Sequence, residues 1–228
     1  ELDGRDVAHD PFTVTGIGDM SGDVFGNGLL RSRSAHLRAA FDHRHVFLDP
    51  DPDPAASFAE RERLFALPRS SWVDYRPELL SKGGAIIARG TKTVRLSAEA
   101  RTLLGIAAET VDSDQLIQAV LRAPTDLLFN GGIGTYVKAQ GETNVEVGDS
   151  ANAVVRVNAG DVHARIVGEG GNLGLTQRGR IELALTGGRL NTDAIDNSGG
   201  VDTSDHEVNL KIALLPLVAS GAMTVDAR

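Results

Sequence analysis

Short β-prone runs alternate along this chain with segments that carry helix-start signals, and this alternation constrains the fold more than any other feature. It is typical of βαβ units, in which helices connect the strands of a parallel sheet. We expect strands at Phe12–Thr15, His45–Leu48, Ala85–Ala88, Asp126–Phe129, Arg165–Val167 and Leu190–Ile195. The pattern therefore predicts an α/β fold with a doubly wound, mostly parallel sheet of the Rossmann-like type.

The expected helices begin at side chains that can cap a helix start. We predict starts at Ser57, Asp112, Thr176 and Ser204. All but Thr176 are followed three residues later by Glu or Gln, which is the capping-box spacing. Pro68, Pro124 and Gly187 mark the ends of the first three helices. Each of these helices therefore connects two of the expected strands or follows the last of them.

The composition narrows the class of partner. The formal net charge is −8, so nucleic acid or an anionic membrane would be repelled over the whole surface, and we expect neither as a partner. The chain has no cysteine and no apolar run near the roughly 20 residues of a membrane span. We therefore expect a cytoplasmic protein that binds a small molecule. Since the chain starts at Glu1 rather than Met, we also expect it to be part of a longer polypeptide.

The stretch "TVTGIGDMSGDVFGNG", residues 13–28, places glycines between a β-prone run and a helix-compatible segment at 24–30. Gly16, Gly18 and Gly22 form G-x-G-x-x-x-G, similar to the turn in which dinucleotide-binding folds hold a pyrophosphate at a helix N-terminus. Ser21 is the expected phosphate donor, whereas Asp19 would repel a pyrophosphate if it pointed at the site. The candidate cofactor-binding residues here are Gly16, Gly18, Asp19, Met20, Ser21 and Gly22. A purely structural turn is the alternative.

Asp49 follows the expected second strand, 27 positions after Gly22. An acidic residue at the end of that strand accepts the hydroxyls of the adenosine ribose. A 2′-phosphate beside it would meet a like charge, at a cost on the order of 1 to 4 kcal/mol at about 4 Å. Asp49 therefore predicts NAD rather than NADP as the cofactor. The alternative is that Asp49, Asp51 and Asp53 form a solvated turn.

Glycines combined with asparagine follow three further expected strands. The clusters are Asn130–Gly131–Gly132, Glu169–Asn172 and Asn197–Ser204. The carboxyl ends of parallel strands line one ligand crevice, and an asparagine supplies both the donor and the acceptor that a carboxamide requires. We expect these clusters to meet at one rim near the nicotinamide, although each by itself also fits a simple turn.

Four segments together resemble the glutamate dehydrogenases, and in particular the large, multidomain, NAD-specific type of bacteria. They are "GIGDMSGDVFGNG", "DLLFNGGIGTYVK", "VGEGGNLGLTQ" and "DAIDNSGGVDTSDHEVN", and the resemblance runs from about Asp10 to about Lys211. It implies that residues 1–228 form a single NAD-binding domain. It also implies a substrate domain upstream in the same polypeptide, a homo-oligomer, and a cleft that holds L-glutamate or 2-oxoglutarate.

The resemblance also carries residue roles. Asn172 in "EGGN" and Asn197 in "NSGGV" are similar to residues near the nicotinamide, and Val201 and Ser204 to positions that shape the glutamate pocket. Ser204 alternatively caps a helix with Glu207. The catalytic lysine and aspartate of the family lie upstream. Lys82 is therefore expected to be a surface residue, and the isolated chain is expected to bind NAD without catalysing the reaction.

Two other functions remain open at this point. A non-catalytic NAD-sensing module has the same scaffold, and an S-adenosylmethionine-dependent methyltransferase has a similar glycine turn and strand-end acid. The asparagine clusters favour the dehydrogenase. We expect no metal at His43 and His45, because no third ligand is near them in the sequence. Trp72 and Tyr75 are expected to pack in the core or against another domain rather than stack on a ligand.

Overall fold

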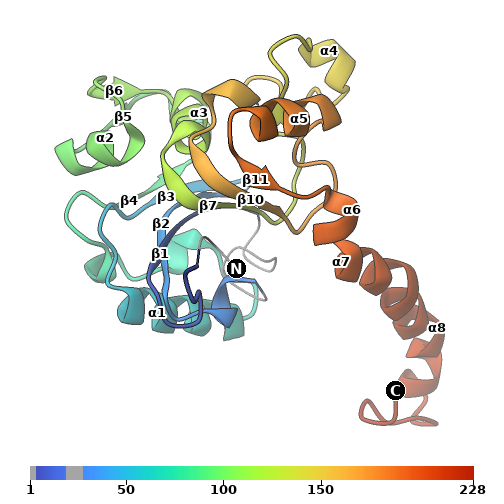
Figure 1. Ribbon diagram of the computed structural model, residues 1–228. Coiled ribbons are helices and arrows are strands. Elements are labelled where there is room, and N and C mark those ends of the chain that lie inside the picture. Colours follow the sequence, from blue (N-terminus) through green and yellow to red (C-terminus); the bar gives the residue numbers. More distant parts are fainter. Residues whose placement is uncertain (1–3, 19–27) are drawn as a thin grey trace.

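A seven-stranded sheet forms the centre of the computed structural model, which describes residues 4–18 and 28–228 (Figure 1). The strand order is β11-β10-β7-β1-β2-β3-β4. The strands are β1 (Phe12–Ile17), β2 (Ala35–Phe41), β3 (His45–Leu48), β4 (Ala85–Ala88), β7 (Thr125–Asn130), β10 (Ala164–Glu169) and β11 (Arg189–Leu190). Strands β1, β2, β7, β10 and β11 are parallel, whereas β3 and β4 pair antiparallel at one edge. The prediction of a mostly parallel α/β sheet is confirmed.

Helices cover both faces of this sheet. Figure 1 shows α1 below the sheet and α2, α3 and α5 above it. The α-helices are α1 (Pro54–Ala66), α2 (Ala98–Leu104), α3 (Ser113–Arg122), α4 (Asn144–Val147), α5 (Gln177–Leu185), α6 (Asp193–Asp196), α7 (Ser198–Asp202) and α8 (Val208–Ala219). The remaining strands form two separate two-stranded sheets. One consists of β5 (Val94–Arg95) and β6 (Thr110–Val111), and the other of β8 (Val137–Lys138) and β9 (Val157–Asn158).

Local capping signals placed two helices correctly. The Asp112 carboxylate accepts from the Gln115 backbone N–H at 2.8 Å, and the Gln115 side chain accepts from the Asp112 backbone N–H at 3.0 Å. The Thr176 hydroxyl accepts from the Gly179 backbone N–H at 2.9 Å at the start of α5. The apolar stripe of α3 is buried against the sheet, and it consists of Leu116, Ile117, Val120 and Leu121. Both helix predictions are confirmed.

Other boundaries were wrong. Helix α1 begins at Pro54 with Asp53 as its cap, so Ser57 lies inside the helix. The predicted strand over Leu190–Ile195 ends at Leu190, because α6 follows at once. Ser204 starts no helix, since residues 203–207 form a π-helical turn between α7 and α8. Its predicted capping box is therefore wrong, and so is the strand expected before Asn197.

Strand β2 was not predicted from the sequence. Three of its seven residues are alanine, which favours helix and hides the β signal. Its pairing with β1 is parallel, and its pairing with β3 is antiparallel. Because β2 was missed, the antiparallel direction of β3 was missed as well.

Two apolar clusters form the core, one on each face of the sheet. The first packs α2, α3 and α5 against the upper face, and the second packs α1 and the residues around Trp72 against the lower face. Trp72 stacks on Phe47 with ring centroids 4.5 Å apart, and Tyr75 meets Phe47 edge-on. The predicted packing role of Trp72 and Tyr75 is confirmed.

Helix α8 projects away from the sheet (Figure 1). Its exposed apolar side chains are Val208, Leu210, Ile212, Leu215 and Leu217. A helix this rich in apolar residues is normally buried, but none of the residues of α8 is buried here. None of the described helices combines the length and the apolar character needed to cross a bilayer.

Candidate functional site

The carboxyl ends of the parallel strands form one edge, which we call the carboxyl rim and define as residues 17–18, 42, 130–134, 169–174 and 191–197. Backbone hydrogen bonds connect the strand ends beyond the sheet itself. Gly18 N–H donates to Phe41 O at 3.0 Å, and Gly131 N–H donates to Ile17 O at 2.6 Å. Glycine at these two positions adds no side chain there, so a ligand can approach the backbone closely.

The glycine turn is described only in part. Gly16 is paired with Ala40 on one side and with Phe129 on the other, so it lies within β1 rather than in a turn, and the expected turn role of Gly16 is wrong. Gly18 has a φ of +148°, which places the start of the turn there. The candidates Asp19, Met20, Ser21 and Gly22 lie outside the described residues.

Asp49 does not lie at the carboxyl rim. Because β3 runs antiparallel to β2, the end of β3 returns toward the middle of β2, where the Asp49 backbone N–H donates to Arg38 O at 2.8 Å. Its carboxylate accepts from the Ser81 backbone N–H at 3.0 Å and from the Ser81 hydroxyl. Burial raises the pKa of Asp49, and the bonds from Ser81 lower it in part. The predicted position of Asp49 beside a ribose is therefore wrong, and its observed role is to tie β3 to the loop before β4.

Asp42 takes the position that was assigned to Asp49. It directly follows the parallel strand β2, and it lies 20 residues after Gly22, since 42 minus 22 is 20. That spacing is the usual one for a ribose-binding acid, and it was the signal that the sequence reading missed. One carboxylate oxygen accepts from the backbone N–H groups of Arg44 at 2.7 Å and His45 at 2.6 Å. The other oxygen, Oδ2, is buried and has no partner among the described residues.

Asn130 ends β7 in the middle of the rim. Its Oδ1 accepts from the Gly132 backbone N–H at 2.9 Å, which folds the chain over the strand end. Its Nδ2 is buried and, within residues 4–18 and 28–228, has no hydrogen-bond partner. The rim thus holds one free acceptor at the end of β2 and one free donor at the end of β7. These are the groups that a ribose diol and a ligand carbonyl or hydroxyl oxygen require, so the donor set fits a nucleotide.

Close approach explains two glycines of the β10 loop. A Cβ at Gly171 would collide with the backbone of Gly132, and one at Gly174 would collide with the Asn130 side-chain amide. The loops after β7 and β10 therefore meet backbone to backbone. Any side chain at either position would push the two rim loops apart.

The structure brings Asn172 and Asn197 together, because the Asn197 side-chain amide donates to Asn172 Oδ1 at 2.7 Å. Asn172 is exposed, whereas Asn197 is buried at the junction of α6 and α7. Val201 lies in α7 and Ser204 in the π-helical turn that follows, on the same continuous helical segment. The side chains of Val201 and Ser204 are outside the described part of the chain.

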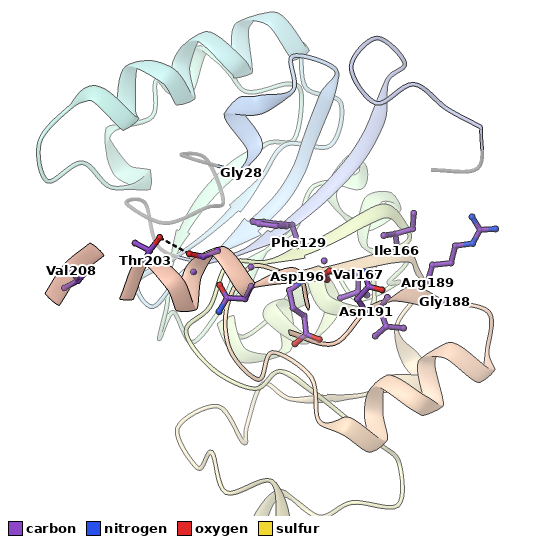
Figure 2. A pocket seen from close by; sticks show the side chains of 17 residues that line it. Gly28, Phe129, Ile166, Val167, Gly188, Arg189, Asn191, Asp196, Thr203 and Val208 are labelled. Atoms are coloured by element: carbon purple, nitrogen blue, oxygen red, sulfur yellow. Dashed lines mark hydrogen bonds between the residues drawn. The ribbon is translucent and has the colours of Figure 1, made fainter. Parts of the chain in front are cut away.

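An open cavity of about 1130 Å³ lies beside this part of the rim. Figure 2 shows it between the sheet residues Phe129 and Val167 and the helical segment that carries Asp196 and Thr203. Glu169, Gly170 and Asn197 also line it. The cavity is large enough for a small-molecule ligand, and most of its polar side chains, Glu169, Asn191, Asp196 and Asn197, belong to the rim.

Glu169, at the rim, and Arg180, in α5, form a buried ion pair that the sequence motifs do not predict. The Arg180 guanidinium donates to both carboxylate oxygens of Glu169, at 2.6 and 2.9 Å. The two residues lie on different elements, β10 and α5, and no motif links them in the sequence. Lys82, in contrast, is exposed on the surface and pairs with Glu99 at 2.7 Å, in agreement with its expected surface position.

A family model and two named relatives match all or nearly all of this chain. Residues 1–228 match the family described as bacterial NAD-glutamate dehydrogenase, catalytic domain. The NAD-specific glutamate dehydrogenase of Mycobacterium tuberculosis is 58% identical over 231 residues, which cover 99% of this chain and 14% of the relative. The protein of the same name from Pseudomonas aeruginosa is 55% identical over 225 residues, with the same two coverages. Among solved structures, a glutamate dehydrogenase of Plasmodium falciparum superposes with a TM-score of 0.48 and 14% identity, covering 83% of this chain and 31% of that one.

Proposed function

Because this chain belongs to the family of bacterial NAD-glutamate dehydrogenase catalytic domains, we propose that it is the NAD-binding part of such an enzyme. The proposed reaction is the oxidative deamination of L-glutamate to 2-oxoglutarate and ammonium. The chain spans 14% of the length of the relatives that it matches. We therefore propose that residues 1–228 form one dinucleotide-binding domain, and that the catalytic lysine and aspartate belong to a substrate domain upstream.

The strand order is the observation that carries this proposal. Strand β1 has β2 on one side and β7 on the other, and both are parallel to it, so the chain moves outward in opposite directions from β1. With helices on both faces, this order supports our proposal of a doubly wound sheet. Ligands of such sheets bind where the strand order reverses, outside the carboxyl ends of the strands. The proposed pyrophosphate position is therefore between the ends of β1 and β7, next to Gly18 and Gly131.

The adenosine ribose belongs, on this proposal, at the end of β2. Asp42 supplies the free acceptor there, and its charge favours a ribose diol over a 2′-phosphate. NAD remains the expected cofactor, but the proposed ribose-binding acid is Asp42 instead of Asp49. The names of the relatives, NAD-specific glutamate dehydrogenases, support the same cofactor.

The nicotinamide half would then lie over β7 and β10. Asn197 lines the adjoining cavity and bonds to Asn172, and Asn130 ends β7 at the same rim. Val201 and Ser204 follow on the same helical segment, where the glutamate side chain would bind. NAD supplies the hydride acceptor when it is bound, whereas the residues of this chain orient the ring and exclude water from one side.

Titration of the full-length enzyme with NAD and NADP tests the proposal. The variant Asp42→Asn keeps the oxygen that accepts from Arg44 and His45 and removes the charge. We expect it to bind NAD roughly tenfold to hundredfold more weakly, because a hydrogen bond to a charged group is worth about 1.5 to 3 kcal/mol. Discrimination against NADP should also fall. Asp51→Asn, which alters an exposed acid nearby, is the matched control and should bind NAD normally.

Two results would contradict the proposal. Unchanged NAD affinity in Asp42→Asn would remove Asp42 from the ribose site, and a wild-type preference for NADP would overturn the cofactor assignment. Tight NAD binding without glutamate-dependent NADH formation would favour a nucleotide-sensing module instead.

A further inference from the structure

A network of charged side chains lies directly beneath the two rim asparagines. Its centre is the pair of Glu169, at the end of β10, and Arg180, in α5, joined by two hydrogen bonds of 2.6 and 2.9 Å. Glu169 Oε2 also accepts from the Leu175 backbone N–H at 3.1 Å. Both side chains are buried, and the hydrogen bonds that Arg180 donates to Glu169 hold the Arg180 pKa above its usual value.

The network continues from Arg180 to the rim loop. Arg180 Nη2 lies 3.0 Å from Asp193 Oδ1, and the other oxygen of Asp193 accepts from the Leu173 backbone N–H at 2.8 Å. Leu173 directly follows Asn172. The charge on Arg180 is therefore connected, through one carboxylate, to the backbone beside one of the two asparagines.

A second branch reaches the other asparagine. Asp196 Oδ2 accepts from the Glu169 backbone N–H at 3.1 Å, and Asp196 Oδ1 accepts from the Asn191 side-chain amide at 3.0 Å. Asp196 directly precedes Asn197, whose amide donates to Asn172. The two branches thus hold the residues adjacent to both asparagines, and the asparagines bond to each other.

The backbone of Leu173 is held in a conformation that residues other than glycine rarely adopt. Its φ is +54°, in the left-handed region, and its side chain is 60% exposed. A residue other than glycine in that region costs on the order of 1 to 3 kcal/mol and persists only where its surroundings impose it. Asp193 accepts from its N–H, and the Thr135 hydroxyl donates to its carbonyl at 2.6 Å.

We propose that Arg180 is a positioning residue which, through Glu169 and Asp193, sets the place of Asn172 and Asn197 against the nicotinamide. This inference rests on the proposed function, because the asparagines matter only if the ring binds there. Stability alone does not explain the pair, since apolar residues of similar volume often replace a buried ion pair without loss. Hydrogen bonds from this network to the backbone of the rim loop do explain why the pair is charged, because an apolar side chain cannot make them.

The test is a comparison of Arg180→Lys with Arg178→Met in the full-length enzyme. Lysine keeps the positive charge but loses the paired geometry of the guanidinium. Arg178 is an exposed arginine on the same helix and is the control. The measurements are kcat, KM for NAD, and the kinetic isotope effect with glutamate deuterated at C2, the carbon that loses the hydride. Amide hydrogen exchange over residues 169–175 is measured in parallel.

For Arg180→Lys we expect kcat to fall by about tenfold to hundredfold, because a small displacement of a reacting group has an effect of this size. KM for NAD should change less than about threefold, since the adenosine half still binds. The isotope effect should increase as hydride transfer becomes rate-limiting, and exchange over residues 169–175 should become faster. Arg178→Met should match the wild type in all four measurements.

Wild-type kcat and isotope effect in Arg180→Lys would overturn the inference. So would a fall in kcat that only follows the folded fraction, with an unchanged isotope effect. A wild-type enzyme that binds NAD but does not oxidise glutamate would contradict the proposed function instead. In that case hydrogen exchange decides the inference alone, because unchanged protection over residues 169–175 in Arg180→Lys would overturn it.

Discussion

Arg180 and Arg61, two of the buried arginines, lie on opposite faces of the sheet and have different surroundings. Arg180, on α5, is 6% exposed and bonds to the carboxylates of Glu169 and Asp193. Arg61, on α1, is fully buried and donates once, to Leu29 O at 3.4 Å. Its Nε and Nη2 have no partner among the residues described. Burial lowers the pKa of Arg61 to about 10, whereas Glu169 raises that of Arg180.

The comparison shows that a buried charge does not by itself hold neighbouring groups in place. A buried charge that lacks partners is destabilising because its lost hydration is not replaced, and it fixes no neighbouring group. A fully bonded charge holds its hydrogen-bond partners in one arrangement. Arg180 lies under the rim that we assign to the nicotinamide. Arg61 lies in the apolar cluster below the sheet, near the rings of Phe58 and Tyr75. The set of partners, rather than the degree of burial, distinguishes the arginine with a role at the site.

Removal of Arg180 should have the largest effect on stability. Arg180→Met leaves the Glu169 carboxylate buried without its partner, so we expect a loss of about 3 to 5 kcal/mol in unfolding free energy. Pulse proteolysis of the full-length enzyme in urea measures it. The double variant Arg180→Met with Glu169→Leu should recover most of the loss, because no uncompensated charge remains. A single variant as stable as the wild type would show that the pair is not buried as described.

Arg61→Met should have a smaller effect with the opposite sign. Methionine keeps most of the apolar stem and removes the unpaired charge, so we expect stability to be unchanged or to rise by about 1 to 2 kcal/mol. The Arg61 pKa of about 10 lies below its usual 12.5, so its destabilising contribution is fully present at lower pH and declines only as pH rises above about 10. The gain should thus be the same at about pH 6 and about pH 8. A loss comparable to that of Arg180→Met would contradict the distinction between the two arginines.

Asp49→Asn should give the smallest effect, and one that depends on pH. Burial raises the pKa of Asp49 above its ordinary 3.8, so the folded state binds the proton more tightly than the unfolded chain. Stability therefore falls as pH rises from the ordinary value through the higher folded one. Asparagine removes that loss. Thermal unfolding should show a small gain at neutral pH that disappears near pH 3.8, with Asp51→Asn as the control. A decrease at neutral pH would mean that the Asp49 charge is stabilising.

The positions of the strands along the chain could be predicted from the sequence better than whether each strand pairs parallel or antiparallel. His45–Leu48 was predicted with its observed bounds, yet its antiparallel pairing moved Asp49 away from the rim. The direction of a strand depends on its neighbour, and that neighbour, β2, was hidden by its alanines. Asp42 was still within reach of sequence reasoning, because its spacing from Gly22 is the common one.

The features that could be predicted from the sequence alone depend on interactions between residues a few positions apart. The caps at Asp112 and Thr176 and the apolar stripe of α3 depend on near neighbours, and the structure reproduces them. The pairing of Glu169 with Arg180, and the meeting of Asn172 with Asn197, depend on how α5 and α6 pack against β10. Only the tertiary structure decided these contacts, because hydrogen bonds between distant segments form once packing has fixed the distance and direction between them.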